Sequence, residues 1–178
     1  MVESALQRSA AHAHNARVAV PETFEEFFQL EHERVLRAFY LVTGDREEAE
    51  DLVQEAFVKV LERWDVVRTM SAPTGYVLQT AMNGFRTRYR RTLMAVRRIS
   101  LISPRSRDAF DEVEVREDVR LALTMLTRRQ RAAIVLTELL GYPSEEAARI
   151  LSIKSSTVRA LTTQARTTLR SILGETDE

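Results

Sequence analysis

Residues 45–64 of this 178-residue chain read DREEAEDLVQEAFVKVLERW, and this stretch carries the strongest periodic signal in the sequence. Its apolar residues recur at spacings of three and four, the period of a helix with one buried face. They are Ala49, Leu52, Val53, Ala56, Phe57, Val60, Leu61 and Trp64. Asp45 followed by Glu48 resembles a capping box, which predicts the start of the helix. The stretch therefore indicates an amphipathic helix with a charged outer face.

The neighbouring segments also read as helices. Before it, Thr23 is a predicted cap after Pro21, and that helix should end near Gly44. Its predicted core residues are Phe24, Phe27, Phe28, Leu36, Phe39 and Tyr40. After it, a helix is predicted from about Ser71 and Pro73 to beyond residue 90. That helix should bury Val77, Thr80, Ala81 and Phe85. No stretch alternates long enough for a strand, so the predicted fold class is all-α.

Residues 93–113 break the helical period. They contain Pro104, three serines and a change from basic to acidic side chains, which is typical of a flexible linker. We therefore expect two small helical domains, residues 21–92 and 114–174, joined by this linker. Residues 1–20 lack steady periodicity and are predicted to be a flexible N-terminal extension.

The C-terminal half contains a candidate helix-turn-helix. Apolar residues predict one helix over 115–126 and another over 132–139, with Thr127 as the cap between them and Gly141 closing the second. A short helix over 144–151, a tight turn over 152–155 and a longer helix from Ser156 follow. Two helices at this spacing are typical of a helix-turn-helix.

The longer helix of this pair has two different faces. One face carries its predicted core residues, which are Val158, Leu161, Ala165, Leu169 and Ile172. Another face carries Arg159, Thr163, Arg166 and Arg170, at offsets of four, seven and eleven. Cations and hydroxyls in such a stripe suit bases and phosphates, but a solvated arginine face on an ordinary helical hairpin gives the same pattern.

Charge is distributed unevenly along the chain. The 26 basic and 26 acidic side chains cancel, and a neutral total would ordinarily argue against a nucleic-acid partner. However, residues 1–62 hold 6 basic and 13 acidic side chains, whereas residues 63–110 hold 10 basic and 2 acidic ones. Residues 111–126 then have a net charge of −3, and residues 127–178 of +2. The sequence thus predicts acidic and basic surfaces that meet different partners.

Composition excludes several classes of function. The chain is too short for a barrel enzyme of about 250 residues, and at 44% apolar residues it is too hydrophobic for a disordered protein. Without cysteine it has no disulfide and no thiolate metal site. No histidine follows a glutamate by three residues, so a helical di-metal carboxylate enzyme is not supported. We expect no catalytic residue, no metal and no cofactor. With no leader and no apolar membrane span, we expect a cytoplasmic protein.

Three segments together resemble the extracytoplasmic-function (ECF) sigma factors of bacterial RNA polymerase. They are DREEAEDLVQEAFVKVLERW (45–64), APTGYVLQTAMNGFRTRYRR (72–91) and LTRRQRAAIVLTELLGYPSEEAARILSIKSSTVRALTTQARTTLR (126–170). They match in order and spacing, and the resemblance covers roughly residues 22–173. It implies a sigma factor, not an enzyme, that directs promoter recognition and transcription initiation. The first domain would then be sigma region 2 and the second sigma region 4.

The resemblance implies two contacts with core RNA polymerase, one on the β′ clamp helices and one on the β flap. The helix at 45–64 would dock on the clamp helices through side chains outside its apolar stripe. These are Asp51, Gln54, Glu55 and Glu62. A solvated helix face would carry the same residue types.

The resemblance also implies that the first domain binds the −10 promoter element. The loop at 65–72 would receive a flipped base of the non-template strand while cations hold the backbone. The implied residues are Arg68, Ser71, Asn83, Arg86, Arg88, Arg90 and Arg91. Trp64 and Tyr76 suit base stacking, but their helical spacing favours burial in the core.

For the second domain, the resemblance implies major-groove recognition of the −35 element. The implied residues are Ser155, Ser156, Thr157, Arg159, Thr163 and Arg166, with the helix start offering hydroxyl and N–H groups to a phosphate. Leu161 and Gln164 stand where many relatives have arginine, and Ser152 stands at a frequent turn glycine. Fewer cations predict weaker and less salt-dependent −35 binding by this domain alone.

The expected partners are core RNA polymerase and promoter DNA, with an anti-sigma factor as a further candidate and no membrane insertion. The alternative function is a stand-alone helix-turn-helix regulator of transcription. It would account for residues 126–173. It would leave the acidic helix and the basic block after it unexplained.

Overall fold

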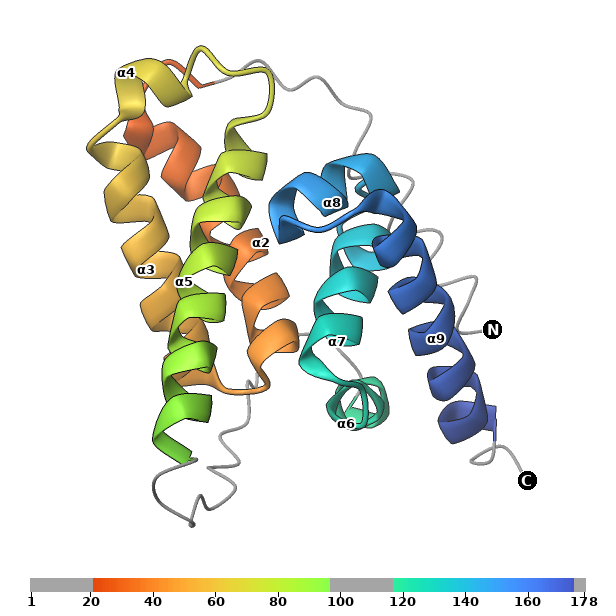
Figure 1. Ribbon diagram of the computed structural model, residues 1–178. Coiled ribbons are helices and arrows are strands. Elements are labelled where there is room, and N and C mark those ends of the chain that lie inside the picture. The colour runs from red at the N-terminus through yellow and green to blue at the C-terminus, as the bar shows by residue number, and fades with distance from the viewer. Residues whose placement is uncertain (1–20, 97–116, 175–178) are drawn as a thin grey trace.

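The structure, a computed structural model, describes residues 21–96 and 117–174, and all regular structure in these ranges is helical (Figure 1). The first domain contains α2 (Phe24–Thr43), α3 (Arg46–Leu61), α4 (Trp64–Val67) and α5 (Pro73–Val96). The second contains α6 (Glu117–Thr124), α7 (Arg128–Ile134), the π-helix η1 (Val135–Leu139), α8 (Ser144–Leu151) and α9 (Ser155–Gly174). The predicted all-α fold is confirmed. The predicted extension at 1–20 lies outside the described residues.

Local side-chain chemistry begins and ends α2 and α3. The Thr23 hydroxyl accepts a hydrogen bond from the Glu26 N–H at 3.2 Å, and Gly44 ends α2 in the left-handed conformation at φ 75°. The Asp45 carboxylate accepts from the Glu48 N–H at 2.8 Å. The Asp45 N–H donates to the Thr43 hydroxyl at 3.2 Å, a partner that the capping-box prediction did not foresee. Both predicted helix starts are confirmed.

The core of the first domain is formed by α2, α3 and α5, and it differs from prediction at the end of α3. Ala49, Leu52 and Val60 are buried as expected, but the Leu61 side chain is 51% exposed. Trp64 opens the separate short helix α4. The chain changes direction after Leu61, so Leu61 leaves the core, whereas Trp64 still packs against it from the next helix.

Helix α5 is longer than predicted and continues to Val96. It thus enters the first four residues of the expected linker. Leucine, methionine and alanine at 93–95 are good helix formers, and the first proline after them is Pro104. The remainder of the expected linker, residues 97–113, lies outside the described residues.

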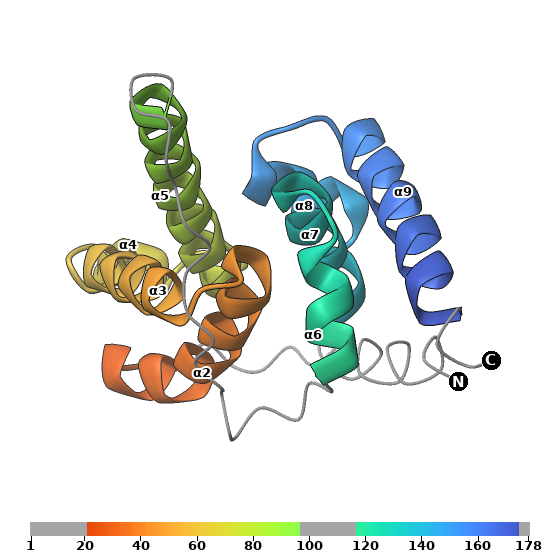
Figure 2. The ribbon, with the colours of Figure 1, turned by 90° about the horizontal axis from the view of Figure 1, so that it is seen from below.

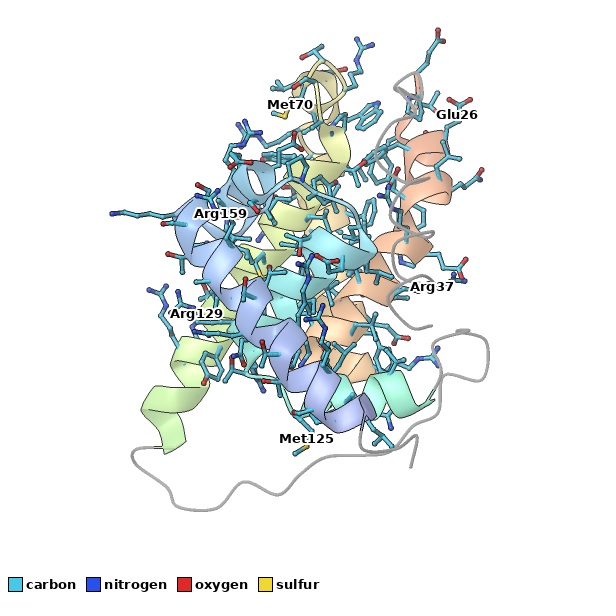
Figure 3. The ribbon with its side chains drawn as sticks, turned by 90° about the vertical axis from the view of Figure 1, so that its right-hand side faces the viewer. Glu26, Arg37, Met70, Met125, Arg129 and Arg159 are labelled. Carbon is cyan, nitrogen blue, oxygen red and sulfur yellow. The ribbon has the colours of Figure 1, made fainter. Side chains whose placement is uncertain are left out.

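The second domain begins with α6, which buries only some of its apolar residues. Leu121 and Met125, two of the apolar residues that predicted this helix, are 51% and 69% exposed, and Met125 points away from the helices at the lower edge of Figure 3. Leu123 and Leu126 are buried. Packing against α9 selects this face of a short helix in which apolar residues occur on several sides.

A capping box and a π-helix shape the segment that leads into the helix-turn-helix. The Thr127 hydroxyl accepts from the Gln130 N–H, and the Gln130 side chain accepts from the Thr127 N–H at 3.0 Å. In η1, the Leu140 N–H donates to the Val135 carbonyl, five residues back. Gly141 at φ 71° then closes this segment, as predicted.

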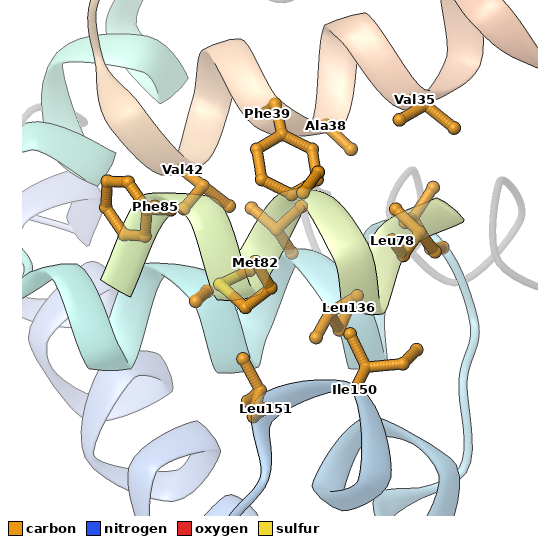
Figure 4. Packing of buried hydrophobic residues seen from close by; sticks show 14 of the residues in the cluster. Val35, Ala38, Phe39, Val42, Leu78, Met82, Phe85, Leu136, Ile150 and Leu151 are labelled. Atoms are coloured by element: carbon orange, nitrogen blue, oxygen red, sulfur yellow. The ribbon is translucent and has the colours of Figure 1, made fainter. Parts of the chain in front are cut away.

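The two domains pack against each other. Helix α2 contacts α7 and η1, and α5 contacts α8 (Figures 1 and 2). Figure 4 shows Leu78 and Met82 of α5 on the side that faces Leu136, Ile150 and Leu151 of the second domain. All five are buried. The buried side chains of both domains therefore form one continuous hydrophobic core.

Candidate functional site

The exposed face of α3 combines acidic, amide and apolar side chains. Asp51, Gln54, Glu55 and Glu62, the four residues expected to bind polymerase, are all exposed along this helix. Between them lie two apolar residues, Val58 at 49% and Leu61 at 51% exposure. We call these six residues the α3 face.

Val58 and Leu61 give this otherwise polar face apolar area that a protein partner can bury. Sequence reasoning missed Val58, although it is an apolar residue outside the buried stripe. It also placed Leu61 in the core. The sequence did carry a signal for Val58, because this residue is apolar but lies off the main helical period.

Arg88 joins the α3 face to α5. Its Nη1 lies 3.3 Å from Oδ2 of Asp51, and its Nη2 donates to the Glu55 carboxylate. Burial lowers the pKa of the Arg88 guanidinium, but Glu55 and Asp51 outweigh this effect and raise it. One residue expected to bind DNA thus contacts two residues expected to bind polymerase. Exposed pairs of this kind contribute about 0–1 kcal/mol, so they can exchange partners at little cost.

The segment at 65–72 is organised by α4. Val67 is fully buried and anchors it, while Arg68 and Ser71 remain exposed. Nε of Arg68 lies 3.6 Å from Oδ1 of Asp65. The loop expected to receive a base therefore has an apolar anchor and an exposed rim.

Trp64 is part of an aromatic cluster in the core. Its ring centroid lies 5.1 Å from that of Phe27 and 5.9 Å from that of Phe24. Its indole N–H donates to the Glu22 carbonyl at 3.4 Å. The Tyr76 hydroxyl accepts from Arg63 at 3.3 Å. For Trp64, these contacts favour the core role over base stacking.

On α5, Arg86 and Asn83 face the second domain. Arg86 donates to the Leu151 carbonyl, to the Ser152 Oγ at 3.1 Å and to the Asn83 side-chain carbonyl. Burial lowers the pKa of Arg86, and the nearby charge of Arg90 lowers it further. Arg90 and Arg91 are exposed one turn further along. The α5 residues expected to bind the −10 element thus lie in different surroundings: Arg86 contacts α8, Arg88 contacts α3, and Arg90 lines the space between the domains.

A cleft of about 660 Å³ lies between the domains, lined by residues of α5, α7, α8 and α9. Its cationic lining comes from Arg86, Arg90, Arg128 and Arg129, and no acidic residue lines it. The Arg128 guanidinium carbon lies 4.8 Å from the centre of the Tyr89 ring and 5.4 Å from that of Phe85. Cation–π contacts of this kind contribute about 0.5–2 kcal/mol. The cleft is therefore electropositive with an apolar, aromatic wall.

The face of α9 that was expected to meet DNA lies on the outside of the second domain. Arg159, labelled in Figure 3, is 3.0 Å from Glu145 of α8, and Arg166 is 2.6 Å from Glu138 of η1. Thr163 lies between them along the helix and is exposed. Both arginines are thereby oriented by carboxylates of the same domain.

The start of α9 carries the three expected hydroxyl residues. Ser156 is exposed, whereas Ser155 and Thr157 are half-buried. The Thr157 N–H donates to the Lys154 carbonyl at 2.9 Å. At Thr157, the group available for a phosphate is therefore the hydroxyl. Lys154, which the sequence reasoning did not select, is also exposed in this turn.

The structure explains the positions at which this sequence departs from the family pattern. Leu161 is half-buried and packs against the core, and Gln164 accepts a hydrogen bond from Gln130 of α7 at 3.4 Å. Ser152 adopts the left-handed conformation at φ 50° that glycine often supplies. Leu161 thus serves packing within the domain, while Gln164 is exposed and hydrogen-bonded to α7.

Within residues 21–96 and 117–174, no three His, Asp or Glu side chains come together as metal ligands. No helix in the same ranges is long and apolar enough to cross a membrane.

Comparison with known proteins finds two family matches on this chain. Residues 27–93 match "Sigma-70 region 2", and residues 116–169 match "Sigma-70, region 4". The ECF RNA polymerase sigma factor SigM of Mycobacterium tuberculosis is 28% identical over 166 residues, covering 93% of this chain and 82% of the relative. The ECF RNA polymerase sigma factor EcfG of Rhodopseudomonas palustris is 30% identical over 145 residues, covering 78% of each chain.

Two solved structures show the same fold. The sigma factor RpoE of Bartonella quintana, in complex with the anti-sigma factor NepR, matches with a TM-score of 0.72 at 24% identity. The match covers 85% of this chain and 96% of that one. CnrH, in complex with the cytosolic domain of CnrY, matches with a TM-score of 0.58 at 18% identity, covering 97% of each chain.

The chain carries two sigma regions in the family order. It also matches a relative that is 30% identical over most of that relative's length. This chain belongs to the ECF sigma factors, which bind core RNA polymerase and direct promoter recognition at the start of transcription.

Proposed function

We propose that three separate faces of this sigma factor divide the work of promoter recognition. The α3 face docks on the β′ clamp helices of polymerase, and the second domain also contacts the β flap. The segment 65–72 and the cationic residues of α5 take the −10 strand, and the outer face of α9 reads the −35 duplex. Residues 21–92 act as region 2 and residues 114–174 as region 4. No step in this scheme makes or breaks a covalent bond.

The observation that carries the proposal is the composition of the α3 face. Val58 and Leu61 are exposed beside four acidic or amide side chains. Burial of apolar area supplies affinity, and charge complementarity supplies specificity and speed of association. A basic, partly apolar helical surface on polymerase is the partner that fits this combination.

The DNA assignments rest on charge and exposure. Arg159 and Arg166 are both about half exposed and oriented by carboxylates, which suits contacts to base edges and phosphates. Arg68 is exposed in the segment expected to receive the strand, and Arg90 and Arg91 are exposed towards the far end of α5. Cations along a strand supply most of the sequence-independent affinity.

An anti-sigma factor is the further partner in this proposal. The solved relatives RpoE and CnrH are complexes with NepR and CnrY, and NepR is an anti-sigma factor. We extend the same class of partner to this chain, which would act where RNA polymerase is found, in the bacterial cytoplasm.

The α3 face is tested by the double variant Gln54→Ala with Glu55→Ala. We expect affinity for core polymerase to fall about tenfold or more, because this change removes charge and hydrogen-bonding groups from the centre of the contact. Affinity is measured by fluorescence anisotropy of the labelled chain. The thermal midpoint from circular dichroism should stay unchanged.

The matched control is Glu26→Ala with Gln29→Ala, which removes the same two residue types from an exposed part of α2. It should bind polymerase like the parent chain. Equal affinity of all three proteins would show that the wrong face has been assigned. Tight duplex binding by a chain that never binds polymerase would favour a stand-alone regulator instead.

A further inference from the structure

Four arginines line the interdomain cleft without a carboxylate among them. They are Arg86 and Arg90 of α5 and Arg128 and Arg129 of α7. Within residues 21–96 and 117–174, none of the four has a carboxylate at ion-pair distance. The charge of Glu48 on α3 acts on one of them, Arg128, but Glu48 does not line the cleft. The cleft thus holds positive charge that its own walls do not neutralise.

The positive groups repel one another across this space. Burial lowers the pKa of Arg86, and the charge of Arg90 lowers it further. The pKa of Arg131, also on α7, is lowered by burial and then by the charge of Arg128. Repulsion between like charges is stronger where water is excluded, and an anion between them would remove it. Because guanidinium groups match phosphate oxygens in geometry and charge, the lining favours a phosphorylated ligand.

The apolar part of the lining suits a flat ring. Phe85 is buried and Tyr89 is 39% exposed, and the Arg128 guanidinium lies over both rings. These contacts orient Arg128, and a guanidinium plane also stacks on ring systems. The remaining apolar residues of the lining are Met82, Ala132, Leu151, Ile153 and Leu161. An aromatic or heterocyclic ring would bury apolar area against this wall.

Asn83 adds a neutral donor beside the cations. Its side-chain carbonyl accepts a hydrogen bond from Arg86, which leaves its NH₂ group for a ligand. An amide NH₂ group donates to ring nitrogens and carbonyl oxygens of nucleobases. At about 660 Å³, the cleft is within the range of small-molecule sites, about 300–1,000 Å³. Cations, a stacking surface and one amide donor are together the groups that recognise a nucleotide.

We propose that the interdomain cleft binds one free nucleotide that carries at least two phosphate groups. Arg86, Arg90 and Arg129 hold the phosphates, and the base lies against Arg128 and the apolar wall. Both domains are needed for this site, because α5 and α7 each supply two of the four cations. The site goes beyond the proposed function, although Arg86 and Arg90 are also proposed to contact the −10 strand.

Binding is tested by isothermal titration calorimetry of the full chain with adenosine diphosphate and guanosine diphosphate. We expect one site per chain. Inorganic phosphate and unphosphorylated adenosine should each bind about tenfold more weakly or worse, because each lacks one half of the recognised groups. No binding of either diphosphate at millimolar concentration would overturn the site and leave the proposed function intact. Several phosphate ions bound per chain as tightly as the diphosphates would show unspecific attraction of anions, which also overturns it.

The position of the site is tested by the variant Arg129→Gln. Arg129 is exposed and has no proposed role in binding DNA. This change should weaken diphosphate binding about tenfold, through the loss of one charge-assisted hydrogen bond. The control Arg149→Gln removes an exposed arginine that does not line the cleft, and it should bind like the parent chain. Equal diphosphate affinity of the two variants would overturn the site.

A further measurement separates a free nucleotide from a nucleotide within a DNA strand. The probe is a fluorescent single-stranded oligonucleotide of random sequence, followed by anisotropy. Arg129→Gln should bind this strand as tightly as Arg149→Gln does, because both variants lose one positive charge and neither arginine has been assigned to the strand. A fall of strand affinity in parallel with diphosphate affinity would mean that the cleft belongs to the path of the strand. That result would overturn the separate nucleotide site and support the assignment of α5 to the −10 element.

Discussion

At the scale of single residues, positions with a special backbone or a special partner carry the strongest constraints. Gly44 ends α2 at φ 75°, a conformation that costs an L-residue with a side chain roughly 1–2 kcal/mol. It also contacts a buried guanidinium of the other domain. Arg159 on α9, a residue proposed to contact DNA, is exposed and is paired with Glu145. A single substitution at either residue therefore tests one specific role.

The variant Gly44→Ala should lose about 1–3 kcal/mol of the free energy of unfolding, because backbone strain and the close contact with Arg131 add together. Urea denaturation followed by circular dichroism measures this loss. Gly75→Ala is the control, since its added Cβ would meet Ala72 at an ordinary 3.6 Å. In the first turn of α5 that change should be neutral or slightly stabilising, because alanine has the higher helix propensity. A neutral Gly44→Ala would contradict the close approach.

The variant Arg159→Ala should lower transcription mainly through the −35 element, by about 1–3 kcal/mol if one good base contact is lost. In vitro transcription with core polymerase, on promoter templates with and without that element, measures the effect. Arg149→Ala removes another exposed arginine from the same domain and serves as the control. Equal loss on both templates would remove Arg159 from base recognition.

At the scale of elements, short-range capping decides where the helices begin. Thr127 and Gln130 form a complete capping box at the start of α7, the helix that packs against α2 and α9. The box satisfies two N–H groups that the helix itself cannot. In the helix-turn-helix, Ser152 ends α8 in a left-handed turn that directs the chain into α9.

The variant Thr127→Ala should therefore cost about 0.5–2 kcal/mol of stability, because it leaves the Gln130 N–H without its cap. Chemical denaturation gives the value. Thr167→Ala is the control, as its hydroxyl bonds only to a carbonyl one turn back on exposed α9. Similar small effects in both variants would mean that the cap contributes little to the folded state.

At the scale of the whole molecule, the contact between the domains surrounds ionisable groups with apolar surface. Burial raises the pKa of the Tyr142 hydroxyl from 10.0 to about 12, with Arg34 and Glu31 of α2 among the neighbouring charges. Glu48 of α3 also has a raised pKa, mainly through burial, and Arg128 of the other domain opposes this. Titration of these groups therefore reports on the packing of the two domains against each other.

For Tyr142 the sign follows from linkage. In the unfolded chain the hydroxyl ionises near pH 10, whereas in the folded chain it keeps its proton to about pH 12. The stabilising effect is thus complete below pH 10 and is lost as the pH rises towards 12, by up to about 3 kcal/mol. Urea denaturation at several alkaline pH values should show this fall in the parent chain. If the Tyr142 side chain is not buried, the parent chain and Tyr142→Phe should show the same dependence of unfolding free energy on pH.

Local sequence predicted much of the fold. The caps at Thr23, Asp45 and Thr127 and the helix end at Gly44 were all predicted, because each depends on residues three or four positions apart. The helix-turn-helix was predicted for the same reason. The left-handed conformation of Ser152 at φ 50° was not predicted.

What the sequence by itself determined is thus the set of helices, their caps and the family to which the chain belongs. Only the tertiary structure decided that Leu61 and Met125 are exposed, that Arg88 bridges α3 and α5, and that Arg86 binds α8. The physical reason is range. Capping and periodicity act within one or two turns, whereas burial and ion pairing depend on which distant surfaces meet, and a helical period does not specify its partner.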